Sequence, residues 1–169
     1  MFTQSLARSF QINAGHNALT IGNENISWDD LKQVVPRTAE GLNTLGCKPG
    51  DRVAVLASNI PEHLQIMYAL SWAGCVLVPL NTRLSPAELA WIISDSESSV
   101  FISDKRNSNL AKTTVSKINS KIVTIQLEKG AFGQHTIQDI KSKTPSAARA
   151  ASNDEIAAIY YTGGTTGQP

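Results

Sequence analysis

The last residues of the chain are rich in glycine and threonine, a composition that can bind phosphate. Residues 162–167 read Thr-Gly-Gly-Thr-Thr-Gly and follow an apolar run at 156–161. Glycine lets the backbone approach a ligand closely, successive backbone N–H groups in such a turn form a concave anion site, and threonine hydroxyls add further donors. The pattern suits phosphate oxygens as ligands, but composition alone favours a surface turn that binds nothing, because glycine-rich turns are common.

Other motifs that carry chemistry are absent from the sequence. No lysine follows the glycines at Walker A spacing, and neither Gly-x-Gly-x-x-Gly nor Gly-x-Ser-x-Gly occurs. The three histidines, His16, His63 and His135, are far apart and show no metal-ligand spacing. Cys47 and Cys75 have neither zinc nor redox spacing, so we expect two buried thiols in a reducing compartment.

Short apolar runs alternate with helical patterns along most of the chain, which is typical of a parallel sheet with helices on its faces. The runs predict buried strands at 53–57, 75–80, 100–103, 122–127 and 156–161. The patterns between them predict helices over about 28–45, 59–73, 85–93 and 107–118. We therefore predict an α/β fold in which a mainly parallel β-sheet is flanked by helices.

The ends of these predicted helices carry recognisable signals. Ser27 with Asp30, and Ser85 with Glu88, have the spacing of a capping box. Pro36 lies inside the first helix and is expected to bend or divide it, because proline removes one backbone donor. Two glycines suit the left-handed stop that ends a helix: Gly46 and Gly74. Three tryptophans occupy apolar helix positions and are expected to anchor the core: Trp28, Trp72 and Trp91.

The alternation divides the chain into three parts. We expect a β/α scaffold over 15–127, an irregular segment and linker over 128–155, and a strand followed by a phosphate-binding loop over 156–169. A compact domain rarely ends directly after its most unusual loop. This is a first sign that the sequence is a fragment of a longer protein.

Composition and charge exclude several classes of function. Lys and Arg total 15 and Asp and Glu total 14, so the chain has no overall field to attract nucleic acid. An excess of basic residues between Lys105 and Arg149 is scattered, with one aromatic residue nearby, and fits solvated helix faces. No secretory segment and no apolar run long enough to span a membrane occur. We expect a cytoplasmic protein that binds no nucleic acid and could form a homo-oligomer.

The terminal motif resembles a known family signature. The string from Tyr161 to Gly167, followed by Pro169, closely resembles the phosphate-binding motif of the adenylate-forming (AMP-binding) superfamily, in which most members have serine at the position of Gly163. This superfamily contains acyl-CoA synthetases, luciferases and the adenylation domains of peptide synthetases. The resemblance extends upstream over roughly 15–169, through the stretches 46–53 and 74–84.

The resemblance implies a two-step reaction. A carboxylic acid attacks the α-phosphate of ATP to give acyl-AMP and pyrophosphate, and CoA or another acceptor then takes the acyl group. Donors around the phosphates, together with Mg²⁺, would offset the repulsion between the carboxylate and the polyanion. The resemblance implies that the ATP phosphates are bound by Thr162, Gly163, Gly164, Thr165, Thr166 and Gly167. Within this set, Thr165 and Thr166 would be the hydroxyl donors.

The resemblance assigns no catalytic residue and no metal ligand to this chain. In the family, the metal-binding glutamate, the hinge and the catalytic lysine all lie downstream of the motif. The resemblance therefore implies that residues 1–169 are part of a larger N-terminal domain and that the C-terminal domain is absent. We expect this chain alone not to form acyl-AMP. We predict the N-terminal part of an acid–CoA ligase that acts on a fatty or other organic acid. Two alternatives stay open: an amino-acid adenylation domain, and a non-catalytic α/β binding or interaction module.

Overall fold

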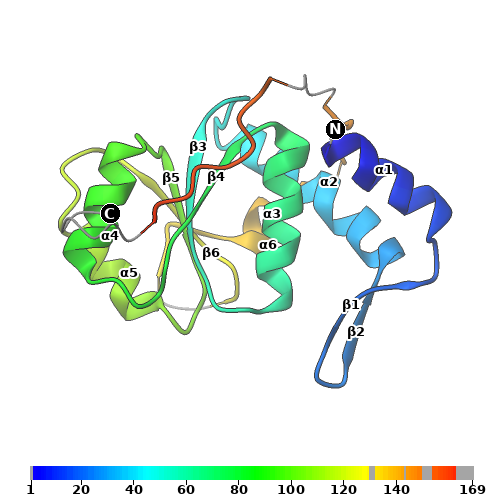
Figure 1. Cartoon of the computed structure of the whole chain (residues 1–169), viewed down its shortest axis with the longest axis horizontal. Helices are drawn as coiled ribbons and strands as arrows, with labels where there is room; N and C mark the ends of the chain where they lie inside the picture. The colour runs from blue at the N-terminus through cyan, green and yellow to red at the C-terminus, as the bar shows by residue number, and fades with distance from the viewer. Residues whose placement is uncertain (1, 130–131, 143, 150–153, 163–169) are drawn as a thin grey trace.

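The structure of the protein is a computed structural model that describes residues 2–129, 132–142, 144–149 and 154–162. Its centre is a sheet of five parallel strands in the order β4-β3-β5-β6-β7 (Figure 1). The strands are β3 (Arg52–Leu56), β4 (Val76–Pro79), β5 (Val100–Ser103), β6 (Val123–Gln126) and β7 (His135–Thr136). The predicted α/β class and the first four predicted strands are confirmed.

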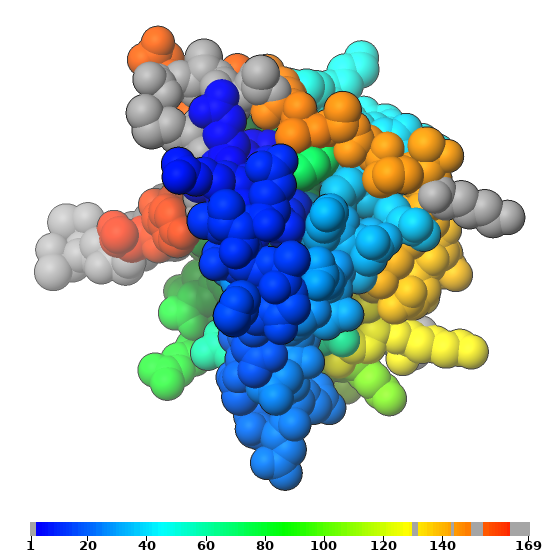
Figure 2. All heavy atoms as spheres, turned by 90° about the vertical axis from the view of Figure 1, so that its right-hand side faces the viewer, coloured from blue at the N-terminus to red at the C-terminus, as the bar shows by residue number. Residues whose placement is uncertain are grey.

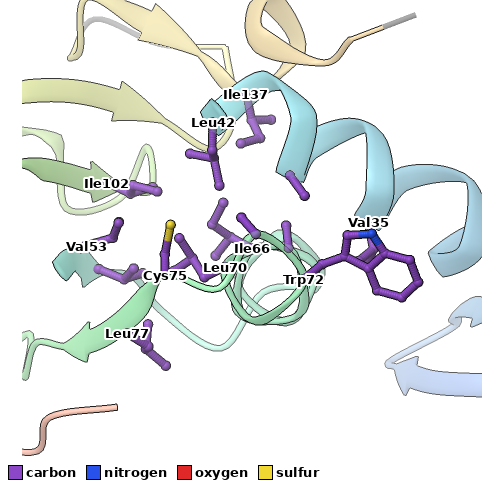
Figure 3. Packing of buried hydrophobic residues seen from close by; sticks show 14 of the residues in the cluster. Val35, Leu42, Val53, Ile66, Leu70, Trp72, Cys75, Leu77, Ile102 and Ile137 are labelled. Atoms are coloured by element: carbon purple, nitrogen blue, oxygen red, sulfur yellow. The ribbon is translucent and has the colours of Figure 1, made fainter. Parts of the chain in front are cut away.

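Helices cover both faces of this sheet, as the alternating pattern predicted. They are α2 (Trp28–Thr44), α3 (Pro61–Ala73), α4 (Pro86–Asp95) and α5 (Ser108–Val115). Side chains of a strand point alternately to opposite faces, so β3 directs Val53 and Val55 to the core beneath α2 and α3, which Figure 3 shows from close by. Ala54 and Leu56 point to a second core, beneath α4 and α5.

The helix ends follow the signals in the sequence. Ser27 and Asp30 form a capping box at the start of α2, and Ser85 and Glu88 form another at the start of α4. Two glycines take the left-handed conformation that ends a helix: Gly46, with φ of 96°, and Gly74, with φ of 77°. Local sequence therefore sets where these helices begin and end.

Helix α2 continues through Pro36 as one element, so of the two expected effects, a bend or a division, the division does not occur. Pro36 and its neighbour Val35 are buried, and packing of this face stabilises the helix across the missing donor. The carbonyl oxygen of Pro36 accepts hydrogen bonds from the backbone N–H and the hydroxyl of Ser146, at 3.2 and 3.0 Å.

Three elements precede α2 that the sequence patterns did not predict. They are α1 (Phe2–Ile12) and an antiparallel hairpin of β1 (Asn17–Ile21) and β2 (Glu24–Ser27). Figure 2 shows α1 and the hairpin, in blue, on one side of the molecule. Helix α1 buries Leu6 and Phe10, and the Phe10 ring lies 5.7 Å from that of Trp72.

The segment expected to be irregular, 128–155, contains β7 and a short helix, α6 (Ile137–Ile140). A capping box of Thr136 and Asp139 starts α6. Helix α6 packs against α2 at Gly41, where a Cβ atom would collide with the carbonyl oxygen of Ile140. The expectation failed because this helix is too short for its apolar spacing to stand out, and tertiary packing stabilises it.

No helix in the described part of the chain is both long and apolar enough to cross a membrane. Cys47 and Cys75 are buried free thiols, as expected.

Candidate functional site

The segment that leads into the glycine–threonine run lies against the free edge of β4. The predicted strand at 156–161 is reduced there to one parallel bridge between Leu77 and Ala158. The backbone N–H of Leu77 donates to Ala157 at 3.1 Å, and that of Ile159 donates to Leu77 at 2.9 Å. In Figure 1 this segment, in red, passes beside β4. Among the described residues, no further backbone bond to β4 follows the one from Ile159, so the pairing is limited to this bridge.

The parallel direction of this bridge has a consequence for the terminal run. Because the two segments run the same way, the chain after Ala158 heads toward the carboxyl end of β4. Ligands of open α/β sheets bind outside the carboxyl ends of the strands. Thr162 is exposed. The other predicted phosphate contacts, Gly163, Gly164, Thr165, Thr166 and Gly167, lie outside the described residues.

Tyr161 is held by two contacts from α4. Its hydroxyl donates a hydrogen bond of 2.6 Å to a carboxylate oxygen of Asp95, and its ring meets the ring of Trp91 edge to face at 5.9 Å between centroids. Burial, together with the hydrogen bond to Asp95 and the charge of that residue, raises the pKa of Tyr161 to about 12. The hydroxyl therefore stays protonated, and donates, throughout the neutral range.

The expectation that Trp91 anchors the core is wrong. Its side chain is 36% exposed, whereas Leu89, Ile92 and Ile93 form the inward face of α4. Trp91 lies on the opposite face of the helix, where its ring contacts the ring of Tyr161. Trp72 is buried and Trp28 packs against the same core, so the expectation holds for those two.

A buried carboxylate connects the loops that follow β3 and β5. Asp104 is 1% exposed and accepts hydrogen bonds from the backbone N–H of Ser58 at 2.8 Å, and from the backbone and side chain of Asn107 at 2.9 and 2.7 Å. Burial opposes ionisation, but the hydrogen bonds from Ser58 and Asn107 outweigh it and hold the pKa of Asp104 below its ordinary value. Sequence reasoning missed this residue, because no local spacing links positions so far apart.

A polar hollow of about 430 Å³ opens beside this carboxylate. It is lined by Ala57, Ser58, Asn59, Thr82, Arg106 and Asn107. These residues follow β3, β4 and β5, so the hollow lies at the carboxyl edge of the sheet. The parallel bridge at Ala158 orients its segment toward the same edge.

His63, near the start of α3, borders the same loops. Its Nδ1 lies 3.2 Å from the carbonyl oxygen of Ser58, which requires the tautomer that is protonated on Nδ1. Its Nε2 is buried and has no hydrogen-bond partner among the described residues. No group of three or more His, Cys, Asp or Glu in the described part of the chain could hold a metal ion. We therefore assign no Mg²⁺ ligand there.

A five-stranded parallel sheet between two helical layers is the architecture of the first part of the large domain of adenylate-forming enzymes. The crystal structure of the anthranilate CoA ligase AuaEII, in complex with anthranoyl-AMP, superposes with a TM-score of 0.90 over 99% of this chain and 33% of its own, at 20% identity. At that identity the likeness concerns the fold alone.

Sequence comparison identifies the family. The profile of the AMP-binding enzyme family matches residues 6–169, and the chain belongs to that family. It is 32% identical to a feruloyl-CoA synthase from Amycolatopsis sp over 90% of this chain and 28% of that protein. Coronafacic acid ligase from Pectobacterium brasiliense is 26% identical, with a TM-score of 0.84 over 95% of this chain and 33% of that one. The chain spans about a third or less of these relatives.

Proposed function

We propose that this chain is the first part of the N-terminal domain of an ATP-dependent acid–CoA ligase. The complete enzyme would activate a carboxylic acid as acyl-AMP with release of pyrophosphate, and then transfer the acyl group to CoA. Membership of the AMP-binding family and the similarity to a feruloyl-CoA synthase support this class. The observation that carries the proposal is the parallel bridge at Ala158, because it orients the segment that precedes the glycine–threonine run toward the carboxyl edge of the sheet.

The residues after Tyr161 have the chemistry that the first step needs. A carboxylate that attacks ATP must approach a polyanion, so donors around the β- and γ-phosphates lower the barrier. We assign this role to the backbone N–H groups from Thr162 to Gly167 and to the hydroxyls of Thr165 and Thr166. Glycine at three of these positions leaves room for the phosphates to approach the main chain.

The substrate that we propose is an organic acid without an α-amino group. The relatives include a feruloyl-CoA synthase, whose name points to an aromatic acid for that protein. An amino-acid adenylation domain shares the motif, but the relatives are acid–CoA ligases and disfavour it. The substrate panel described below separates these possibilities.

The test uses the protein encoded by the full reading frame that contains this chain. Exchange of labelled pyrophosphate into ATP is measured with ferulate, benzoate, anthranilate, fatty acids of several lengths and the standard amino acids, followed by CoA-dependent loss of acyl-AMP. We expect exchange with at least one organic acid and none with amino acids. Loss of one transition-state donor lowers such rates about 10²- to 10³-fold, which we expect for Thr165→Ala or Thr166→Ala.

A matched substitution controls for the general effect of removing a hydroxyl. Thr113 lies on the exposed side of α5 and bonds only its own helix, through Asn109 at 3.1 Å, so Thr113→Ala should leave exchange unchanged. Exchange that depends on amino acids instead would identify a peptide-synthetase domain. If calorimetry detects no ATP binding and no acid supports exchange, the chain belongs to a non-catalytic module. The 169-residue chain alone should release no pyrophosphate.

A further inference from the structure

The two cysteines occupy equivalent places at the ends of two neighbouring helices. Each directly follows a left-handed glycine, Gly46 after α2 and Gly74 after α3. The backbone N–H of Cys47 donates to Leu42 at 3.1 Å, and that of Cys75 donates to Leu70 at 2.9 Å. Both are the long-range bond of a Schellman motif, in which the residue after the glycine turns its side chain back toward the helix.

Backbone hydrogen bonds hold the two cysteine-containing segments side by side. The N–H of Gly50 donates to Gly74, and the N–H of Val76 donates to Asp51, each at 2.8 Å. These bonds lie on either side of Cys75 and attach it to the turn that follows Cys47. The Sγ of Cys75 lies 3.7 Å from the carbonyl oxygen of Lys48, the residue next to Cys47.

Both thiols lie in the same buried core. Cys47 and Cys75 are 6% and 3% exposed and belong to one hydrophobic cluster. Figure 3 shows Cys75 in this cluster, which also contains Val53 and Leu70. The sequence separation conceals this proximity, which the packing of α2 against α3 creates.

The pair is electrostatically unequal. The hydrogen bond from Cys75 lowers the pKa of Cys47, against burial and the nearby charge of Asp51. The same hydrogen bond, together with burial, raises the pKa of Cys75. Cys47 is therefore the sulfur that loses its proton first, and Cys75 is the thiol that stabilises it. The thiolate is the nucleophilic form of cysteine.

We propose that Cys47 and Cys75 form a modification site, at which a peroxide oxidises the two thiols to an intramolecular disulfide. The Cys47 thiolate attacks one oxygen of hydrogen peroxide and breaks the O–O bond, which leaves a sulfenic acid on Cys47 and releases hydroxide. The sulfur of Cys75 then gives up its proton, attacks the Cys47 sulfur and displaces a second hydroxide. Two protons convert the hydroxides to water, so two thiols are oxidised while one peroxide is reduced to two waters.

Peroxide is the class of oxidant that suits this site. Both sulfurs are buried, so a bulky disulfide such as oxidised glutathione cannot reach them without opening the core, whereas peroxide is nearly as small as water. The resulting bond would join the turn after α2 to the start of β4. Because it closes a loop that is open in the reduced chain, it should raise the unfolding temperature.

The alternative explanation is that both thiols are small apolar groups that fill space, as buried cysteines commonly do. That explanation predicts two thiols that stay inert while the chain is folded. The two explanations therefore differ in one measurable property, which is the fate of the thiols in the folded chain after exposure to peroxide.

The experiment treats the reduced full chain with a stoichiometric amount of hydrogen peroxide, then alkylates it with N-ethylmaleimide in denaturant and measures intact mass. We expect a product that has lost two hydrogens and carries no alkyl group. After reduction and renewed alkylation, the same product should carry two alkyl groups. Peptide mapping should place the bond between Cys47 and Cys75. Alkylation of both cysteines, disulfide-linked dimers, or stable sulfinic acid without a disulfide would overturn the proposal.

Two variants test the roles within the pair. In Cys75→Ser, peroxide should leave a sulfenic acid on Cys47, which dimedone traps once denaturant has exposed it, whereas in Cys47→Ser the remaining Cys75 should react at least tenfold more slowly. Equal reactivity in the two variants would contradict the assignment of Cys47 as nucleophile. If a serine variant fails to fold by circular dichroism, the corresponding alanine variant replaces it. The wild-type measurement decides the proposal in either case.

Discussion

The hydroxyl of Tyr161 donates a hydrogen bond of 2.6 Å to the carboxylate of Asp95, the last residue of α4. Asp95 precedes β5, while Tyr161 immediately precedes the glycine–threonine run. The bond therefore attaches the entrance of the run to the helical layer over the second core. Together with the bridge at Ala158, it fixes this segment on two sides, at β4 and at α4.

Removal of this hydroxyl should loosen the segment without unfolding the chain. Tyr161→Phe keeps the ring that contacts Trp91 and deletes the bond to Asp95, so we expect a loss of about 0.5–1.5 kcal/mol in unfolding free energy. Hydrogen exchange at Ile159, whose N–H bonds Leu77, should accelerate. Tyr160→Phe is the matched control, because Tyr160 is 69% exposed. Unchanged exchange at Ile159 would show that the bond does not hold the segment.

The ionisation of Tyr161 should be visible in a spectrophotometric titration. Its pKa is raised to about 12 in the folded chain. The protonated hydroxyl therefore contributes fully to the free energy of unfolding below the ordinary tyrosine pKa near 10, and this contribution is lost as the pH rises through about 12. The difference between the wild-type and Tyr161→Phe titrations should have its midpoint near 12, provided that the chain is still folded there by circular dichroism. Asp95→Asn removes the neighbouring charge and should lower that midpoint; a difference curve centred near 10 would contradict the contact.

The buried carboxylate of Asp104 should make stability depend on acid. Its pKa is depressed in the folded chain, so its contribution is present above the unfolded value near 4 and is lost as the pH falls through the lower, folded value. Asp104→Asn turns an amide donor toward the N–H donors of Ser58 and Asn107, and should cost about 2–3 kcal/mol at pH 7. Urea unfolding at several pH values measures both effects.

The control for Asp104 is Asp154→Asn, since Asp154 is exposed. We expect that variant to match wild type at every pH. The acid-dependent part of the stability should shrink only in Asp104→Asn. A parallel loss of stability with acid in wild type and Asp104→Asn would show that another carboxylate is responsible.

The contact between α2 and α6 should tolerate no side chain at Gly41. Alanine is a better helix former than glycine by about 1 kcal/mol, but its Cβ would collide with the carbonyl oxygen of Ile140. We expect Gly41→Ala to lower the unfolding free energy by about 1–3 kcal/mol, the usual range for overpacking. Gln33→Ala, at an exposed position of the same helix, should be neutral within about 0.5 kcal/mol. A stabilised Gly41→Ala chain would show that α6 does not pack there.

The features that could be predicted from the sequence are those encoded by neighbouring residues. Apolar runs, capping boxes and stop glycines lie within a few positions of one another, so the four main strands, the helices between them and the α/β class followed from local chemistry. The phosphate-binding assignment from Thr162 to Gly167 likewise rests on a contiguous string, and it stays a prediction.

Tertiary structure decided every feature that depends on residues far apart in the chain. Helix α6 forms where it packs on Gly41. Trp91 faces outward and contacts Tyr161. Asp104 accepts hydrogen bonds from two loops. Cys47 and Cys75 enter one buried cluster because two helices end side by side. None of these pairs has a local signature, because the order of strands and the packing of helices, rather than spacing along the chain, set which side chains come within contact distance.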